Sequence, residues 1–254
     1  MLKRANTNLQ VVKNYVIIFI LFVVLSFGLI FLGELIAPTN VQWIFTLLRY
    51  IIAVTFILYI NKRIFKNEIS FKFPKSFVAC VGWLVAIAFV LYNLWGLTHS
   101  TIHLNTNTEI TNFLFCVGPG IFEELWFRGV IFNRLSEINK SKKFGIIIAL
   151  LLSAFLFMLS HLLVPDYSSS VMMMWQAVES FGMGILFATI YYVTRNLGLS
   201  MLMHFSRDFC TFFIFWQFPF LNNFSPAQIN IGFFCACIII SAFLLIIKDI
   251  NNKK

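Results

Sequence analysis

The chain has 254 residues, of which 60% are hydrophobic and only 11% are charged, and its mean hydropathy is +0.87. A soluble globular domain carries about 25% charged residues, so this composition excludes an ordinary water-soluble protein. The formal net charge is +9, and the distribution of the basic residues along the chain indicates the origin of this charge.

Eight stretches are apolar and long enough to cross a bilayer as helices, which takes about 20 residues each. They are 15–37, 43–60, 77–98, 111–133, 144–164, 172–194, 199–218 and 229–247. The first is too long for the apolar part of a signal peptide and has no small-residue cleavage site, so we expect it to be retained. The sequence predicts an all-α, polytopic transmembrane helical bundle of about eight spans, forming a single membrane domain over 1–254.

Basic residues gather in alternate connections between these spans. They lie before the first span and after the second, fourth, sixth and eighth. The residues in these connections are Lys3, Arg4, Lys13, Lys62, Arg63, Lys66, Lys72, Lys75, Arg134, Lys140, Lys142, Lys143, Arg195, Lys248, Lys253 and Lys254. The other connections, 38–42, 99–110, 165–171 and 219–228, contain no Lys or Arg. Since cytoplasmic loops collect Lys and Arg, we expect both termini in the cytoplasm. The charge is then explained by the lipid bilayer, with no nucleic-acid partner.

Ionisable side chains inside a bilayer are rare and generally face a bundle interior or a water-filled cavity. Spans four to seven carry the following such residues mid-span: Glu123, Glu124, Arg128, His161, Glu179, His204, Arg207 and Asp208. Arg49 and Glu34 lie nearer the span ends, and we interpret them as interfacial anchors. Glu179 has two open interpretations, because it can line a cavity or pair with Arg207.

Helical spacing divides the charged group on the fourth span. Glu124 and Arg128 stand at i and i+4 and share one face, so they can form an ion pair. Glu123 is rotated by about 100° from Glu124, which leaves its carboxylate free for general-base chemistry. His204 and Asp208 also share a face at i and i+4. A purely structural ion-pair network between helices is the alternative interpretation of these charges.

The motifs of several other intramembrane proteases are absent, which limits the catalytic chemistry that this chain can use. The chain has no HExxH zinc motif and no GxSxG nucleophile motif, and Asp208 is the only aspartate within a predicted span. The remaining inventory is Glu, two His and Asp on three helices. This set suits hydrolysis by an activated water, with one Glu and one His acting on the water and the other pair stabilising an oxyanion.

Three segments, EELWFR (123–128), FMLSH (157–161) and HFSRD (204–208), together resemble the motifs of the CPBP family of intramembrane endopeptidases. The family motifs read EExxxR, FxxxH and Hxxx(N/D), in this order and on separate membrane helices. The family includes CAAX prenyl proteases and bacterial members linked to bacteriocin processing and self-immunity. The resemblance covers about 122–208, and Gly182, Gly184 and the run RNLGLSMLMH also match the family's pattern.

The resemblance implies an abortive-infection-type helical bundle in a bacterial cell membrane, with a catalytic core at about 111–218. It implies endopeptidase activity on membrane-associated peptide or protein substrates, in peptide or bacteriocin maturation or in self-immunity. The family roles, carried over by motif position, are water activation by Glu123 and His161, oxyanion stabilisation by His204 and Asp208, and support by Glu124, Arg128 and Phe157.

Two features complicate these roles. The last motif position is often Asn, which can donate a hydrogen bond, whereas an ionised Asp208 only accepts, so Asp208 can instead orient His204 or pair with Arg207. Straight, upright helices would also place His161 and His204 at different depths, too far apart to share a water. Tilted or broken helices, or a shift in one span boundary, would reconcile these depths.

The cofactor and the function each have an alternative. A metal-free, glutamate-type mechanism is predicted, but Glu123, His161 and His204 carry ligand types that zinc accepts, so zinc stays an alternative. The alternative function is a non-catalytic bacteriocin-immunity or partner-binding protein on the same scaffold. A proton-coupled transporter is a third interpretation, although the internal repeats that it would favour are not evident.

Overall fold

The computed structural model describes residues 20, 24, 28, 42–95, 106–140, 144–162, 170–213 and 225–252. Its longer elements are α-helices α2 (Gln42–Ile60), α3 (Phe77–Leu94), α4 (Thr106–Glu124), α5 (Asn133–Ile138), α6 (Gly145–Leu162), α7 (Ser170–Thr194), α8 (Leu197–Phe213) and α9 (Pro226–Asn252). Two π-helical segments extend this set, η2 (Asn61–Phe65) after α2 and η4 (Leu125–Phe132) between α4 and α5. The all-α class is confirmed. Every predicted span from the second onward overlaps a helix, and of the first span only residues 20, 24 and 28 are described.

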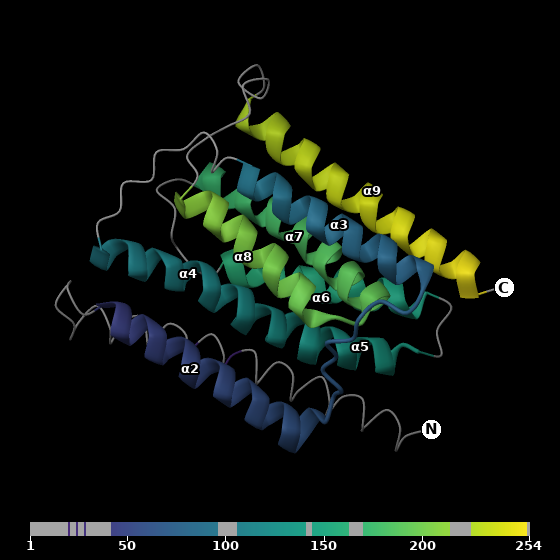
Figure 1. Cartoon of the computed structure of the whole chain (residues 1–254), viewed down its shortest axis with the longest axis horizontal. Coiled ribbons are helices and arrows are strands. Elements are labelled where there is room, and N and C mark those ends of the chain that lie inside the picture. Colours follow the sequence, from purple (N-terminus) through teal and green to yellow (C-terminus); the bar gives the residue numbers. More distant parts are fainter. Residues whose placement is uncertain are drawn as a thin grey trace.

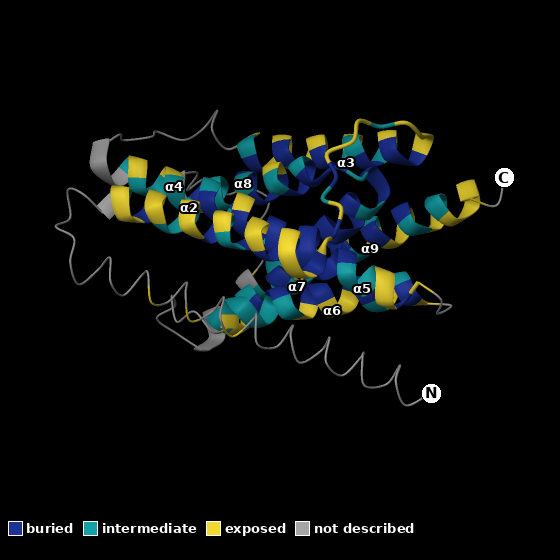
Figure 2. Cartoon of the chain, turned by 90° about the horizontal axis from the view of Figure 1, so that it is seen from below, coloured by how far each residue is buried: buried dark blue, intermediate teal, exposed yellow. Residues whose placement is uncertain are grey.

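Helix α7 is the centre of the bundle. In its most apolar window 78% of the residues are buried, against 22% for α2 with η2 and 17% for α9. Figure 1 shows α2 beside α4 on one side of the bundle and α9 beside α3 on the other. Figure 2 shows the same gradient, with buried residues concentrated on α7 and exposed ones frequent on α2 and α9. The apolar outer helices are therefore available to contact lipid, and the polar site lies toward the interior.

The protein is an integral, multi-pass membrane protein. Within the described ranges, five helices are long and apolar enough to cross a membrane: Trp43–Phe65, Phe77–Leu94, Gly145–Leu162, Met173–Thr194 and Ala227–Asn252. Helices α4 and α8 fall outside this group, since α8 has only 17 residues and α4 begins with the polar run TNTE. Both carry charged motifs, which lowers their apolar content. The total of eight spans and the cytoplasmic termini stay predictions.

The connection 66–76 between η2 and α3 is hydrogen-bonded into the bundle, and we call it the α2–α3 strap. Its Asn67 side chain donates to the Val130 carbonyl of η4 at 2.8 Å. Asn133 donates to the Glu68 carbonyl at 3.1 Å. The Leu197 amide, at the start of α8, donates to the Ser70 carbonyl at 2.8 Å. The strap thus joins one end of η4 to the turn between α7 and α8.

Candidate active site

The three motif-bearing helices α4, α6 and α8 meet around the ring of Phe157. This side chain is fully buried, and its ring centroid lies 4.6 Å from that of His161 and 5.7 Å from that of His204. The two histidines, which upright helices would have separated, therefore flank a single aromatic ring. The separation expected for upright helices is therefore not observed.

Two glycines allow helices of the bundle to pack closely. A Cβ atom on Gly120 of α4 would lie 3.1 Å from the Met201 carbonyl oxygen and 3.2 Å from the Phe205 nitrogen on α8. A Cβ on Gly184 of α7 would lie 2.9 Å from Ala154 of α6. Because these contacts leave no room for a larger side chain, the glycines let the helix backbones approach and bring their polar residues together.

Glu124 and Arg128 form the ion pair that their spacing predicted. Arg128 Nη1 donates to Glu124 Oε1 at 2.7 Å, and both side chains are completely buried. Arg128 Nη2 also donates to the Gly184 carbonyl at 3.3 Å. The guanidinium lies 4.4 Å from the ring centroid of Phe157 and 5.4 Å from that of Phe187. A buried charge needs such compensation, and the pair neutralises one of the two adjacent glutamates.

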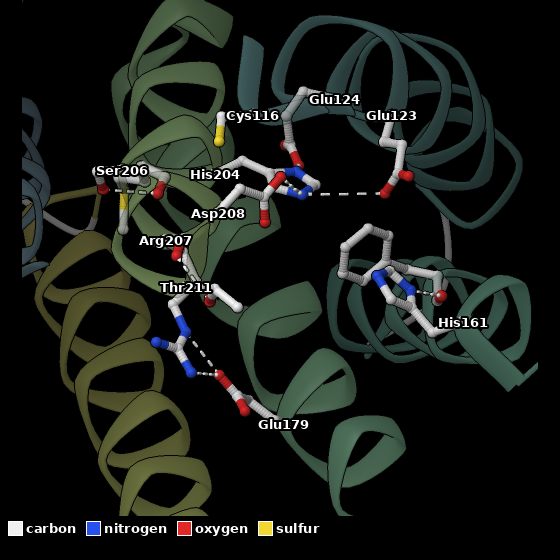
Figure 3. A network of polar contacts seen from close by, with 12 residues as sticks. Cys116, Glu123, Glu124, His161, Glu179, His204, Ser206, Arg207, Asp208 and Thr211 are labelled. Atoms are coloured by element: carbon white, nitrogen blue, oxygen red, sulfur yellow. Dashed lines mark hydrogen bonds and ion pairs between the residues drawn. The ribbon is translucent and has the colours of Figure 1, made fainter. Parts of the chain in front are cut away.

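His204 links the buried pair to the rest of the site. Its Nδ1 lies 3.0 Å from Glu124 Oε1, and its Nε2 lies 3.6 Å from Asp208 Oδ2 and 3.9 Å from Glu123 Oε2. A carboxylate only accepts, so Nδ1 carries the proton in this contact. Neutral His204 then has a bare Nε2, and it can donate from Nε2 only as an imidazolium. Figure 3 shows the ring between the carboxylates of Glu124 and Glu123.

His161 has its tautomer fixed in the same manner. Its Nδ1 lies 2.9 Å from the Phe157 carbonyl oxygen, one turn back on α6. A carbonyl only accepts, so Nδ1 donates and neutral His161 presents a bare Nε2. His161 is partly exposed, and Figure 3 places it across from Glu123 on a separate helix. A bare, partly exposed imidazole nitrogen is suited to accept a proton from water.

The three carboxylates and the one imidazole at the centre of the site differ in their exposure to solvent. Glu124 and His204 are 0% and 4% exposed, whereas Glu123 and Asp208 are 22% and 25% exposed. Among the described protein atoms, Glu123 Oε2 and Glu124 Oε2 both lack a hydrogen-bond partner. Exposure therefore distinguishes the inner pair from the outer one, and the partly exposed carboxylates of Glu123 and Asp208 are the ones that a water or a substrate can reach.

Glu179 and Arg207 pair with each other, which decides the alternatives that the sequence left open. Arg207 Nε donates to Glu179 Oε1 at 2.7 Å, and its Nη2 contacts the same oxygen. The pair joins α8 to α7, and Arg207 also lies 5.6 Å from the ring centroid of Phe233 on α9. Asp208, one residue further on, lies beside His204, so its orientation toward the histidine is the arrangement observed.

Sequence reasoning missed one group at the site and the ring contacts of one arginine. Phe187 of α7 contacts both Arg128 and His204, with its ring centroid 5.8 Å from that of His204. Arg49 of α2, interpreted as an interfacial anchor, lies against the rings of Tyr50 and Phe115. Neither residue belongs to a motif, and the only available signal for Arg49 was an arginine within an apolar span. Glu34 lies outside the described residues.

Zinc ligation by Glu123, His161 and His204 is the alternative that the sequence left open. In the part of the chain that the structure describes, no group of three or more His, Cys, Asp or Glu side chains is arranged to hold a metal ion. The Nδ1 atoms of His161 and His204 are engaged with Phe157 and Glu124, which leaves both Nε2 atoms bare, as in histidines that bind a metal. Zinc at Glu123, His161 and His204 stays the alternative to the predicted metal-free mechanism.

Comparisons with known proteins agree with the motifs. The family model described as type II CAAX prenyl endopeptidase Rce1-like matches residues 105–210, which include all three motifs. The membrane-embedded CAAX protease MroQ of Staphylococcus aureus (strain USA300) is 29% identical over 184 residues, covering 62% of this chain and 68% of that protein. No solved structure gives a significant match.

Proposed function

We propose that this chain, which belongs to the CPBP family of intramembrane endopeptidases, hydrolyses peptide bonds with a water molecule activated by Glu123 and His161. The observation that carries the proposal is the division of the site. Glu124 and Arg128 are completely buried and His204 nearly so, and the three are bonded to one another, whereas the Glu123 side chain is 22% exposed. A purely structural network has no need of a solvent-exposed carboxylate beside a completely buried one.

In the proposed reaction, a water bound between Glu123 and His161 loses a proton as its oxygen attacks the peptide carbonyl carbon. The Glu123 carboxylate or the bare Nε2 of His161 accepts that proton. The carbonyl oxygen becomes an oxyanion, the carbon–nitrogen bond then breaks, and the protonated group returns the proton to the leaving amine. Two acceptors on different helices, α4 and α6, suit this transfer because they can hold the water from two directions.

His204 and Asp208 are proposed to stabilise the oxyanion. His204 can donate from Nε2 only as an imidazolium, since its Nδ1 donates to Glu124. Three carboxylates lie within 4 Å of the ring nitrogens, and their negative charge favours the imidazolium. Asp208 Oδ2 lies 3.6 Å from Nε2, and its negative charge favours the imidazolium while the Nε2 proton stays available for the oxyanion. Glu124, Arg128 and Phe157 support the site by fixing the His204 ring.

We propose that the mechanism is glutamate-type and needs no metal. Treatment with a chelator followed by dialysis is then expected to leave peptide cleavage unchanged, because no step depends on a bound cation. The assay is cleavage of the substrate by purified protein in lipid nanodiscs, with the treated protein compared to a mock-dialysed sample. Loss of activity that only added zinc restores would show that the enzyme is a metalloprotease.

The proposed substrates are peptides or proteins presented at or within the bilayer, in peptide or bacteriocin maturation or in self-immunity. Comparative peptidomics of cells carrying the wild-type protein or the Glu123→Gln variant tests this directly. Precursor peptides are expected to accumulate in the variant and their products to disappear. Identical peptide profiles would favour the alternative, a non-catalytic immunity or partner-binding protein on this scaffold.

A further inference from the structure

The α2–α3 strap and the first residue of α3 expose a row of aromatic and basic side chains that the candidate site does not use. Phe71, Phe73 and Phe77 are 54%, 76% and 69% exposed. Lys72 and Lys75 stand between them and are exposed as well. We call these five residues the strap surface. Exposed apolar side chains that gather in one place and are bordered by charged residues generally mark an interaction site.

The strap surface is held in place by the bundle. The Lys72 amide donates to the Arg195 carbonyl at 3.0 Å, and the Asn196 side chain donates to the Lys72 carbonyl at 3.0 Å. The ring of Phe73 stacks on that of Trp83 of α3, with their centroids 5.8 Å apart. Because these contacts fix the backbone and the ring before any partner arrives, binding to the strap surface has a small ordering cost.

The strap lies at a boundary between membrane and water. It connects Trp43–Phe65 to Phe77–Leu94, two helices that are long and apolar enough to cross a membrane. Figure 1 shows it at the end of the bundle where α9 also ends, and the distribution of basic residues predicts that this end is cytoplasmic. At this depth apolar rings contact the upper part of the acyl chains, and lysine side chains extend to the headgroups.

The charge of this region complements an anionic lipid. Glu68 is the only acidic residue in 61–77, a stretch that contains five basic residues: Lys62, Arg63, Lys66, Lys72 and Lys75. Glu68 lies 3.4 Å from Lys72, but the two side chains are 70% and 58% exposed, so water screens this ion pair. A zwitterionic lipid offers the rings the same acyl chains but has no net negative charge for the lysines.

The strap also connects its surface to the motif helices. Asn67 donates to the Val130 carbonyl of η4 at 2.8 Å, and η4 contains the last residues of the first motif. The Leu197 amide of α8 donates to the Ser70 carbonyl at 2.8 Å, and α8 carries His204. A lipid that holds the strap at the level of the headgroups therefore acts on both elements through direct hydrogen bonds.

We propose that the strap surface binds anionic phospholipid of the surrounding leaflet, and that this binding raises the rate of cleavage. The lysines contact the headgroup, and the phenyl rings insert beside the acyl chains. The partner is membrane lipid, and not a soluble peptide or protein. Lipid binding is independent of the proposed endopeptidase function, whereas its effect on cleavage rests on that function.

Lysine variants test the binding by native mass spectrometry of the full-length protein in detergent, titrated with phosphatidylglycerol or phosphatidylcholine. The wild type is expected to bind phosphatidylglycerol more tightly. Lys75→Gln is expected to weaken that binding about fivefold, the usual contribution of one lysine at an anionic lipid surface. Lys140→Gln is the matched control, because it removes the same charge from another exposed position on the predicted cytoplasmic side. Equal losses in the two variants would show that net charge alone attracts the lipid and would overturn the inference.

The aromatic part has its own pair of variants. Phe73→Ala is expected to weaken phosphatidylglycerol binding, because Phe73 is the most exposed ring of the strap surface. Phe243→Ala is the control and is expected to bind like the wild type, since Phe243 is 54% exposed on α9. Inorganic phosphate is expected not to displace the lipid. Wild-type affinity of Phe73→Ala, or displacement by phosphate, would overturn the inference. Thermal unfolding midpoints in detergent establish that the variants are folded.

The effect on cleavage is measured in nanodiscs of phosphatidylcholine with and without phosphatidylglycerol. The wild type is expected to cleave faster when phosphatidylglycerol is present. Lys75→Gln is expected to lose this acceleration and to match the wild type in phosphatidylcholine alone. Equal wild-type rates in the two nanodiscs would overturn the effect on cleavage. If Lys75→Gln cleaves more slowly but binds phosphatidylglycerol like the wild type, the strap surface binds the substrate and the inference is wrong.

Glu123→Gln is measured in parallel, so that failure of the inference can be told from failure of the proposed function. It is expected to bind phosphatidylglycerol as tightly as the wild type while failing to cleave. If it retains full cleavage, the proposed mechanism is wrong, and the lipid affinities alone decide whether the strap surface binds anionic lipid.

Discussion

Replacement of Glu123 by Gln is expected to abolish detectable peptide cleavage, lowering kcat by about 10²–10⁴-fold, the usual contribution of a general base. Gln has nearly the same shape, but its amide cannot accept a proton from water. Because Glu123 is partly exposed and makes no hydrogen bond through Oε2, the substitution leaves the buried Glu124–Arg128 pair intact. The measurement is cleavage of a substrate by purified protein in nanodiscs.

Glu137→Gln is the control for this substitution. Glu137 is 55% exposed and pairs with Arg134 at 2.9 Å, so its replacement removes one carboxylate that lies outside the three motifs. Its activity is expected to equal that of the wild type. Both variants should show wild-type unfolding midpoints. Full activity of Glu123→Gln would remove Glu123 as the base and return attention to His161 and His204.

The second large effect concerns stability. Replacing Arg128 with Met is expected to lower the free energy of unfolding by about 3–5 kcal/mol, because it leaves the completely buried Glu124 carboxylate without its cation. The Glu124→Gln/Arg128→Met double variant is expected to regain most of that stability and to remain inactive. Both changes are measured by unfolding titration with sodium dodecyl sulfate in mixed micelles.

Arg134→Met provides a matched comparison, since it breaks an ion pair that spans one helical turn at an exposed position. Arg134 and Glu137 are 33% and 55% exposed, so the expected change is below about 1 kcal/mol. Equal effects of Arg128→Met and Arg134→Met would mean that water or lipid headgroups reach Glu124. The buried network would then contribute little to holding His204.

The sequence alone was sufficient to predict the helices and the pairs of charged residues within one helix. Apolar runs located the described spans to within a few residues, because bilayer thickness fixes their length. The i, i+4 spacing predicted the Glu124–Arg128 pair and the proximity of His204 to Asp208, which follow from helix geometry alone. The three motifs indicated a common site before any contact between their helices was known.

Contacts between helices were beyond the reach of sequence reasoning. The position of His161 relative to His204 depends on how α6 and α8 pack around Phe157, and the close approaches at Gly120 and Gly184 depend on the residues of other helices that face them. Glu179 could be placed only when α7 and α8 were seen together. The same holds for the contact of Arg49 with the rings of α2 and α4, because such tertiary contacts leave no periodic signal in one sequence.

The α2–α3 strap limits where this protein can be cut, tagged or lengthened. Loops between membrane spans are ordinarily the preferred sites for epitope insertion, because few backbone groups there are bonded. Here the strap bonds η4 through Asn67 and the start of α8 through Ser70, so an insertion between these residues would displace one end of both motif helices at once. The segment that joins the second and third spans is therefore expected to tolerate insertions poorly, unlike an ordinary loop between membrane spans.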